Sequence, residues 1–96
     1  MRLLNVFQNF ELYSLSSQIR RAADSVVLNI AEGCTGQSNN EYRRFLKYSL
    51  RSAIEVVSCL FIARKKCYLN EGDFIKYYPS YEILCRMITK FRDALG

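Results

Sequence analysis

Histidine and tryptophan are missing from the 96-residue chain, which also has only one proline and four glycines. Without histidine, the chain can form neither a Cys–His nucleophile pair nor the commonest zinc sites. No two of its four cysteines form a C-x-x-C pair; they are Cys34, Cys59, Cys67 and Cys85. A glycine-rich phosphate loop and a nucleophile elbow are also absent from the sequence. We therefore predict no enzyme activity, no catalytic residue, no metal site and no cofactor.

Long apolar runs are missing too, because no stretch approaches the roughly 18 to 20 uninterrupted apolar residues that a bilayer span needs. The first residues carry one basic side chain, a short apolar patch and no small-residue cleavage site, so they do not fit a signal peptide. These features predict a cytoplasmic protein with reduced cysteines and no membrane contact. The scarcity of turn-forming residues favours a few long helices over many short strands.

Hydrophobic residues make up 50% of the chain, which is typical of one packed domain and predicts a single domain over residues 1–96. Fourteen lysines and arginines stand against nine acidic residues, which gives a net charge of +5. A basic surplus of this size suits an anionic partner such as RNA or DNA, although it would serve solubility equally well.

Apolar residues recur at helical spacing along almost the whole chain. Residues 1–8 predict about two turns of helix, and residues 9–14 predict a loop. The next helix is predicted to begin at Ser16 or Ser17. Two glycines are predicted to end it, Gly33 and Gly36. The first of them is expected to adopt the left-handed conformation common at helix ends.

Two capping sequences mark the starts of the remaining helices. Ser38 with Glu41 forms a capping box, after which a helix can run to about Lys66. Asn70 with Asp73 marks the start of the last helix after a short turn.

Pro79 stands inside the last helical pattern and predicts a kink or break around residues 77–80. Together, these elements predict an all-α fold, an antiparallel up-and-down four-helix bundle with a shortened first helix. The third predicted helix is apolar over a broader surface than one neighbour can cover, so we expect the chain to form a homo-oligomer.

Five sequence blocks carry a resemblance to one protein family: Ser17-Gln18-Ile19-Arg20-Arg21-Ala22-Ala23, Asn29-Ile30-Ala31-Glu32-Gly33, Glu41-Tyr42-x-x-Phe45-Leu46, Ser52-x-x-Glu55 and Cys67-Tyr68-Leu69. The chain resembles the small four-helix-bundle proteins encoded within intervening sequences of bacterial 23S rRNA genes. The accessory protein of diversity-generating retroelements is similar to that family. The resemblance implies a ring-shaped homopentamer with a basic surface and nucleic-acid binding, and the retroelement relatives also bind a reverse transcriptase. The chain departs from the pattern in its shorter first helix and at four positions, Asp24, Val27, Leu28 and Arg51.

Six basic residues are the candidates for contact with nucleic acid: Arg20, Arg21, Arg43, Arg44, Lys47 and Arg51. The first two lie on the polar side of the second predicted helix, and three of the others recur at i, i+3 and i+7 on the third. Clusters of this kind attract backbone phosphates. The same cluster also fits a solvated helix face or an inter-subunit contact, with charges partly neutralised by pairs such as Arg51 with Glu55.

Asn29, Glu32 and Glu55 are polar residues within otherwise apolar helices. Two carboxylates on neighbouring helices can share a proton or a divalent cation. However, the Glu-x-x-His motif of helical metal sites is absent. We therefore predict that these residues pair with Arg20 or Arg21 and fix the register between the second and third helices.

The leading hypothesis is a non-catalytic, oligomeric protein that binds structured RNA or DNA with low sequence specificity. The alternative is a protein-interaction scaffold or accessory subunit, for example one that docks a reverse transcriptase through the surplus apolar surface.

Overall fold

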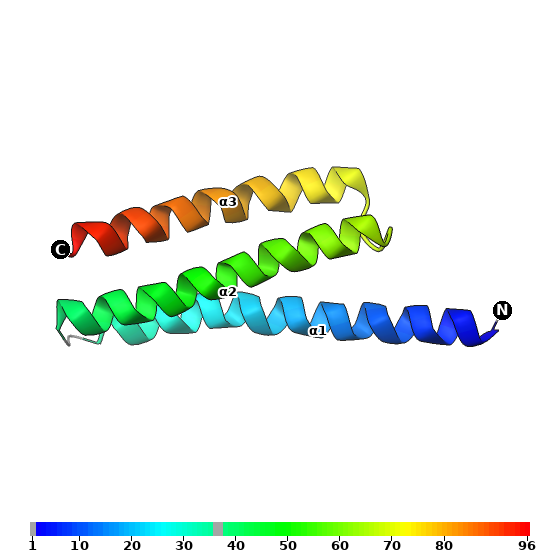
Figure 1. The fold of residues 1–96 in the computed structure, drawn as a ribbon, viewed down its shortest axis with the longest axis horizontal. Helices are drawn as coiled ribbons and strands as arrows, with labels where there is room; N and C mark the ends of the chain where they lie inside the picture. Colours follow the sequence, from blue (N-terminus) through cyan, green and yellow to red (C-terminus); the bar gives the residue numbers. More distant parts are fainter. Residues whose placement is uncertain (1, 36–37) are drawn as a thin grey trace.

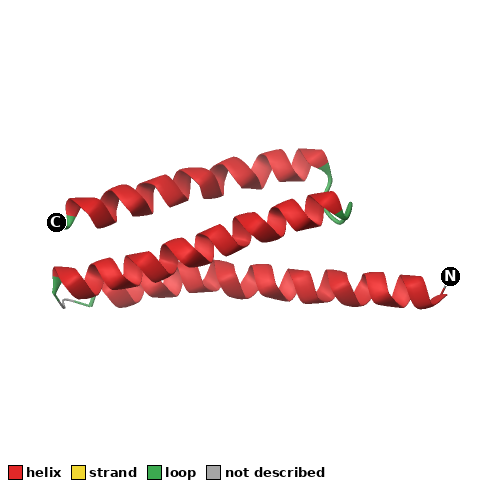
Figure 2. Ribbon diagram, in the orientation of Figure 1, coloured by secondary structure: helices red, strands yellow, loops and turns green. Residues whose placement is uncertain are grey.

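Three helices make up the computed structural model, which describes residues 2–35 and 38–96. They are α1 (Arg2–Gly33), α2 (Asn39–Lys65) and α3 (Glu71–Ala94). Consecutive helices run in opposite directions and are joined by short turns (Figure 1). The described residues contain no strand (Figure 2). The predicted all-α, up-and-down arrangement is therefore confirmed, but the described part of the chain holds three helices and not four.

One long helix replaces the first two predicted helices. The predicted short helix over residues 1–8 and the loop over residues 9–14 are wrong, because α1 continues unbroken from Arg2. Met1 lies outside the described residues. No proline or glycine stands between residues 2 and 32, so no residue of the kind that ends helices interrupts α1. Extending a helix that has already formed costs little, because the unfavourable step is nucleation.

Gly33 lies at the end of α1 because of close packing and not because of a left-handed backbone. Its φ angle is not positive, so the predicted left-handed conformation is wrong. A Cβ built on Gly33 would lie 2.7 Å from Cδ1 of Tyr42, so a larger residue would collide with that ring. The amide of Cys34 donates to carbonyls of the last turn, which closes the helix. The predicted role of Gly36 lies outside the described residues.

Side-chain caps begin α2 and α3 where the sequence predicts them. The hydroxyl of Ser38 accepts a hydrogen bond from the amide of Glu41 at 3.2 Å. The side-chain oxygen of Asn70 accepts from the amide of Asp73 at 2.8 Å. Each cap satisfies a backbone donor that the first turn of a helix leaves unpaired. Both predicted helix starts are confirmed.

The turn between α2 and α3 depends on Cys67, whose φ of 62° lies in the left-handed region. Beyond it, the amides of Tyr68 and Leu69 both donate to the carbonyl of Ala63, at 2.9 and 3.2 Å. This arrangement satisfies a carbonyl of the last turn of α2, in a position that glycine usually occupies.

Pro79 lies within α3 without interrupting it, because the helix runs from Glu71 to Ala94. Of the kink or break predicted around residues 77–80, the break is therefore wrong. Proline removes one amide donor and leaves the carbonyl four residues earlier, that of Ile75, without its helical partner. Both residues are exposed, so water can hydrate this carbonyl and the helix can continue.

α2 lies between the other two helices and packs against both, whereas the backbones of α1 and α3 do not approach each other in the described part of the chain. One buried cluster consists of Ala22, Val56, Leu60 and Phe74. A second consists of Val26, Leu46, Ala53 and Ile88. Both clusters draw residues from all three helices, so the core lies along α2. Ala53 is 0% exposed, and its single methyl group lets both outer helices approach at this point.

One buried serine and two half-buried serines hold α1 against α2. Ser49 is 0% exposed, and its hydroxyl donates to the carbonyl of Val26 at 2.8 Å. The hydroxyl of Ser52 donates to that of Ser25, also at 2.8 Å. A buried polar group is costly unless it is paired, so these bonds favour one register between the two helices.

Large apolar side chains remain exposed on all three helices. The set includes Val6, Phe10, Tyr13, Val27, Leu28, Ile54, Ile75, Ile83 and Met87, each more than half exposed. Even so, the helices of the described region fall short of the apolar length needed to span a bilayer. Exposed apolar side chains that lie next to one another are typical of an interaction surface.

Candidate nucleic-acid interface

The outward side of α2 carries a row of three exposed basic side chains, Arg44, Lys47 and Arg51. Their spacing places them on one face of the helix, turned away from its buried residues, over about 10 Å of helix axis. Lys47 and Arg51 take part in none of the ion pairs among the described residues, and no pair joins Arg51 to Glu55. We call these three residues the basic row of α2.

Two arginines near the start of α2 have local partners. Arg44 pairs with Glu41 at 2.8 Å, but the two side chains are 54% and 37% exposed, so water screens the pair and it contributes little to stability. Arg43 is half-buried and donates to the side-chain oxygen of Asn40. Arg43 is therefore less free to meet a ligand than the basic row beside it.

The two arginines of α1 point in different directions. Successive helical residues are rotated by about 100°, so Arg20 and Arg21 cannot share one face. Both are exposed, but Arg21 also lines a cleft of about 260 Å³ between α1 and α2. The other residues that line this cleft are Gln18, Ala22, Ser25, Ser52 and Glu55. The six candidates therefore do not form one surface.

Asn29, Glu32 and Glu55 lie at three different places. The amide of Asn29 donates to the carbonyl and hydroxyl of Ser25, at 2.8 and 3.0 Å. Glu55 lines the cleft described above, and Glu32 is exposed near the end of α1. Neither glutamate forms an ion pair with the α1 arginines in the part of the chain that the structure describes. Two serine hydrogen bonds join these parts of α1 and α2 instead, from Ser49 to Val26 and from Ser52 to Ser25.

α3 contributes two basic residues that the sequence analysis did not identify, Arg86 and Lys90. They line a groove of about 450 Å³ between α2 and α3, together with Leu50, Ile54, Cys85 and Thr89. Ile54 follows Lys47 and Arg51 by seven and three positions, so it lies beside the basic row of α2. Arg86 forms an ion pair with Glu82 at 2.5 Å, so Lys90 is the residue that extends the positive surface from α2 across the groove to α3. The i, i+4 spacing of Arg86 and Lys90 is a sequence signal, but only the packing shows that both border this groove.

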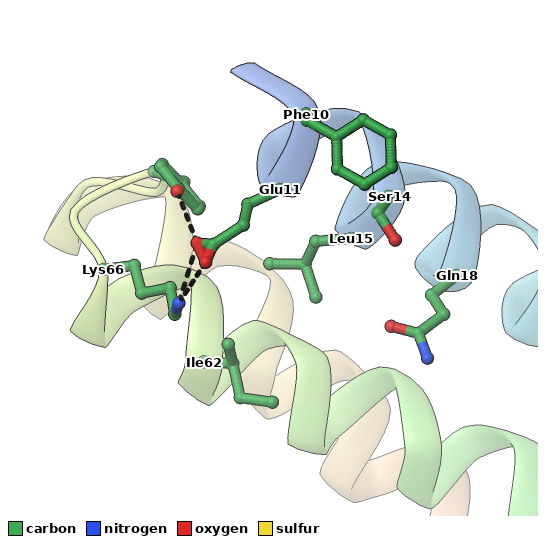
Figure 3. A pocket seen from close by; sticks show the side chains of 8 residues that line it. Phe10, Glu11, Ser14, Leu15, Gln18, Ile62 and Lys66 are labelled. Atoms are coloured by element: carbon green, nitrogen blue, oxygen red, sulfur yellow. Dashed lines mark hydrogen bonds and ion pairs between the residues drawn. The ribbon is translucent and has the colours of Figure 1, made fainter. Parts of the chain in front are cut away.

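Glu11 connects α1 to the turn after α2 (Figure 3). Its carboxylate accepts hydrogen bonds from Lys66 at 2.8 and 2.9 Å and from the hydroxyl of Tyr68 at 3.0 Å. The hydrogen bond with Lys66 lowers the pKa of Glu11 and raises the pKa of the lysine. Because the two charges neutralise each other, Lys66 adds little to the positive surface.

Two of the cysteines, Cys59 and Cys85, are wholly or partly buried. Burial raises the pKa of Cys59 and of Cys85, which favours the less nucleophilic thiol form. The described residues include no group of three potential metal ligands. The feature that distinguishes this surface is therefore its positive charge.

A comparison with protein-family models gives a match over residues 1–90, to the model described as 23S rRNA-intervening sequence protein. No curated protein and no solved structure matches the chain.

Proposed function

We propose a function from one premise, that the chain belongs to the 23S rRNA-intervening sequence protein family. The function is non-catalytic binding of structured RNA or DNA, with low sequence specificity, by an assembly of like chains. The number of copies in that assembly, five in the ring implied by the resemblance, stays a prediction.

The basic row of α2 is the observation that carries this proposal. Arg44, Lys47 and Arg51 are exposed along about 10 Å of helix axis, over which one strand of a duplex presents about three phosphates. Lys90 adds positive charge across the neighbouring groove, where Arg86 is paired with Glu82. The row is thus matched to a phosphate backbone in both length and charge.

Low sequence specificity follows from the chemistry of these side chains. Contacts with phosphates position a protein on nucleic acid but carry no sequence information directly. The basic row lies in the first half of α2, whose opposite side is buried in the core. Its long side chains are therefore suited to follow a backbone, and we assign them no contact with a particular base.

A scaffold or accessory subunit is the alternative function. The exposed apolar side chains favour it, because patches of this kind mark protein interfaces. A helical partner, such as a reverse transcriptase, would be recovered with the chain even after nuclease treatment.

Salt titration of nucleic-acid binding tests the leading proposal. Replacing Arg44, Lys47 and Arg51 with glutamate should abolish the binding of duplex DNA and structured RNA seen with the unmodified chain. For the unmodified chain, the slope of log affinity against log salt should be about −2.7 if three duplex phosphates are neutralised, and steeper if more are.

A matched pair of single variants controls for net charge. Lys47→Glu and Lys76→Glu change the charge equally, and both lysines are exposed, but Lys76 lies on α3 outside the basic row. Lys47→Glu should weaken binding more than Lys76→Glu. Affinity that ignores salt, or that survives the triple substitution, would refute the proposal.

A further inference from the structure

The groove between α2 and α3 has an apolar floor that the core holds in place. Leu50 and Cys85 are half-buried and pack against the second buried cluster. Ile54 is 51% exposed and completes the floor from α2. The volume of the groove, about 450 Å³, falls within the range of small-molecule pockets. The groove is therefore large enough to receive a flat ring system.

Exposed cations stand on both rims of this groove. Lys47 and Arg51 precede Ile54 by seven and three residues on α2, which places them beside the floor. Lys90 lines the groove from α3. None of these three cations takes part in an ion pair among the residues that the structure describes. The groove thus complements a ligand that carries negative charge on both sides of an apolar group.

The acidic residues near the cavities support this choice of groove. The described residues that line it include no carboxylate. Glu82, one turn before Arg86 on α3, forms an ion pair with that arginine, so the two charges cancel. By contrast, Glu11 lines the cavity beside the turn after α2, and Glu55 lines the cleft between α1 and α2. Charge therefore distinguishes the α2–α3 groove from those two cavities.

The floor offers a surface for stacking and almost no hydrogen bonding. The hydroxyl of Thr89 donates to the carbonyl of Cys85 at 2.8 Å, so its proton is already used. The other atoms of the floor are nearly all apolar. Such a surface can pack on the face of any base, since every base has an apolar face, but it cannot read the edge of a particular one. The low sequence specificity proposed above is therefore expected of the groove as well.

We propose that the groove receives one unpaired base of the bound nucleic acid, while Lys47, Arg51 and Lys90 contact the phosphates on either side of that base. The inference rests on the proposed binding of nucleic acid and specifies its ligand as a strand with a bulged or looped nucleotide. A base inside a continuous duplex is stacked between its neighbours and has no free face. A base in a bulge or loop is unstacked and can enter a pocket between apolar side chains.

Three RNA hairpins that differ at one position test this inference. The first has a single bulged adenosine, the second has an abasic residue at the same place, and the third is fully paired. The first two carry the same phosphates, so the difference between them reports the base alone. Stacking of one base should make the unmodified chain bind the bulged hairpin about five- to tenfold more tightly than the abasic one. The fully paired hairpin should bind no better than the abasic one. Fluorescence anisotropy at one salt concentration measures these affinities.

A matched pair of isoleucine variants tests whether the groove is the site of this preference. Ile54→Gln removes apolar surface from the floor without changing the net charge. It should bring the affinities for the bulged and abasic hairpins close together, while the abasic hairpin binds as before. Ile62→Gln is the control, because Ile62 lies on the same helix and is 45% exposed but lines the cavity beside Glu11. It should leave the preference unchanged, and circular dichroism confirms that both variants keep their helices.

Equal affinity of the unmodified chain for the bulged and abasic hairpins would overturn the inference and leave the proposed function standing. A preference that survives Ile54→Gln, or that Ile62→Gln removes to the same extent, would also overturn it. So would a lower mass of Ile54→Gln in light scattering, because the groove would then be a contact between copies of the chain. If none of the hairpins binds, the proposed function and this inference both fail.

Discussion

Replacing Ser49 with alanine removes a fully buried hydroxyl that joins α1 to α2. A buried hydrogen bond contributes about 0.5 to 1.5 kcal/mol of net stability. The carbonyl of Val26 keeps its partner within α1, so no polar group is left unpaired. Alanine also favours helix over serine by roughly 0.5 kcal/mol. Ser49→Ala is therefore expected to lower the free energy of unfolding by only about 0.5 kcal/mol.

The exposed Ser58 on the same helix provides a matched comparison. Ser58→Ala gains the helix preference without losing the buried bond, so it should stabilise the protein by about 0.5 kcal/mol. The predicted difference between the two variants, about 1 kcal/mol, measures the hydrogen bond of Ser49. Urea unfolding followed by circular dichroism gives both values, at one protein concentration because association would add stability. Equal stabilities would refute the role of this bond in fixing the register.

Gly33→Ala should destabilise the protein by about 1 to 2 kcal/mol, because the new Cβ would lie 2.7 Å from the ring of Tyr42. Gly72→Ala should stabilise it by about 0.5 to 1 kcal/mol, because the atom nearest to its new Cβ lies 3.4 Å away. Opposite shifts of the urea midpoint check this pair. Pro79→Ala should stabilise α3 by about 1 to 3 kcal/mol by restoring an amide donor, and an unchanged midpoint would contradict the reasoning. The hydrogen bond from Lys66 lowers the pKa of Glu11 in the folded protein below 4.5, its ordinary value. The ionised carboxylate therefore stabilises the folded protein above pH 4.5, and this stabilisation is lost as the pH falls through the folded pKa. The thermal midpoint of Glu11→Gln should therefore fall less than that of the unmodified chain between neutral pH and about pH 3.

The starts of α2 and α3 could be predicted from local sequence, because each capping hydrogen bond joins two residues within a stretch of four. Ser38 and Asn70 each bond an amide three positions later, so no distant part of the chain is needed. The prediction of a loop over residues 9–14 was wrong for a related reason. Residues 1–8 are too few to form a stable helix alone, yet they need no separate nucleation when they continue a helix already formed.

Pro79 shows where a local rule becomes insufficient. Whether a proline breaks a helix depends on whether the carbonyl it leaves unpaired can reach water, and that follows from the packing of α3 on α2.

The candidate interface could be predicted only where one helix determines it. The spacing of Arg44, Lys47 and Arg51 on α2 is a property of the sequence. By contrast, the cleft that Arg21 lines and the groove that Lys90 lines are formed between two helices. Helical periodicity specifies directions around one axis and cannot specify which neighbour lies there, so those contacts required the structure.

The central position of α2 has a consequence for the order in which the chain can open. α1 and α3 each pack on α2, and their backbones do not approach each other in the described residues. Either outer helix can therefore separate while the other remains attached, but α2 cannot unfold without releasing both. Amide hydrogens of α2 should consequently exchange with solvent most slowly. A helix from another molecule could also replace one outer helix without unfolding of the whole chain.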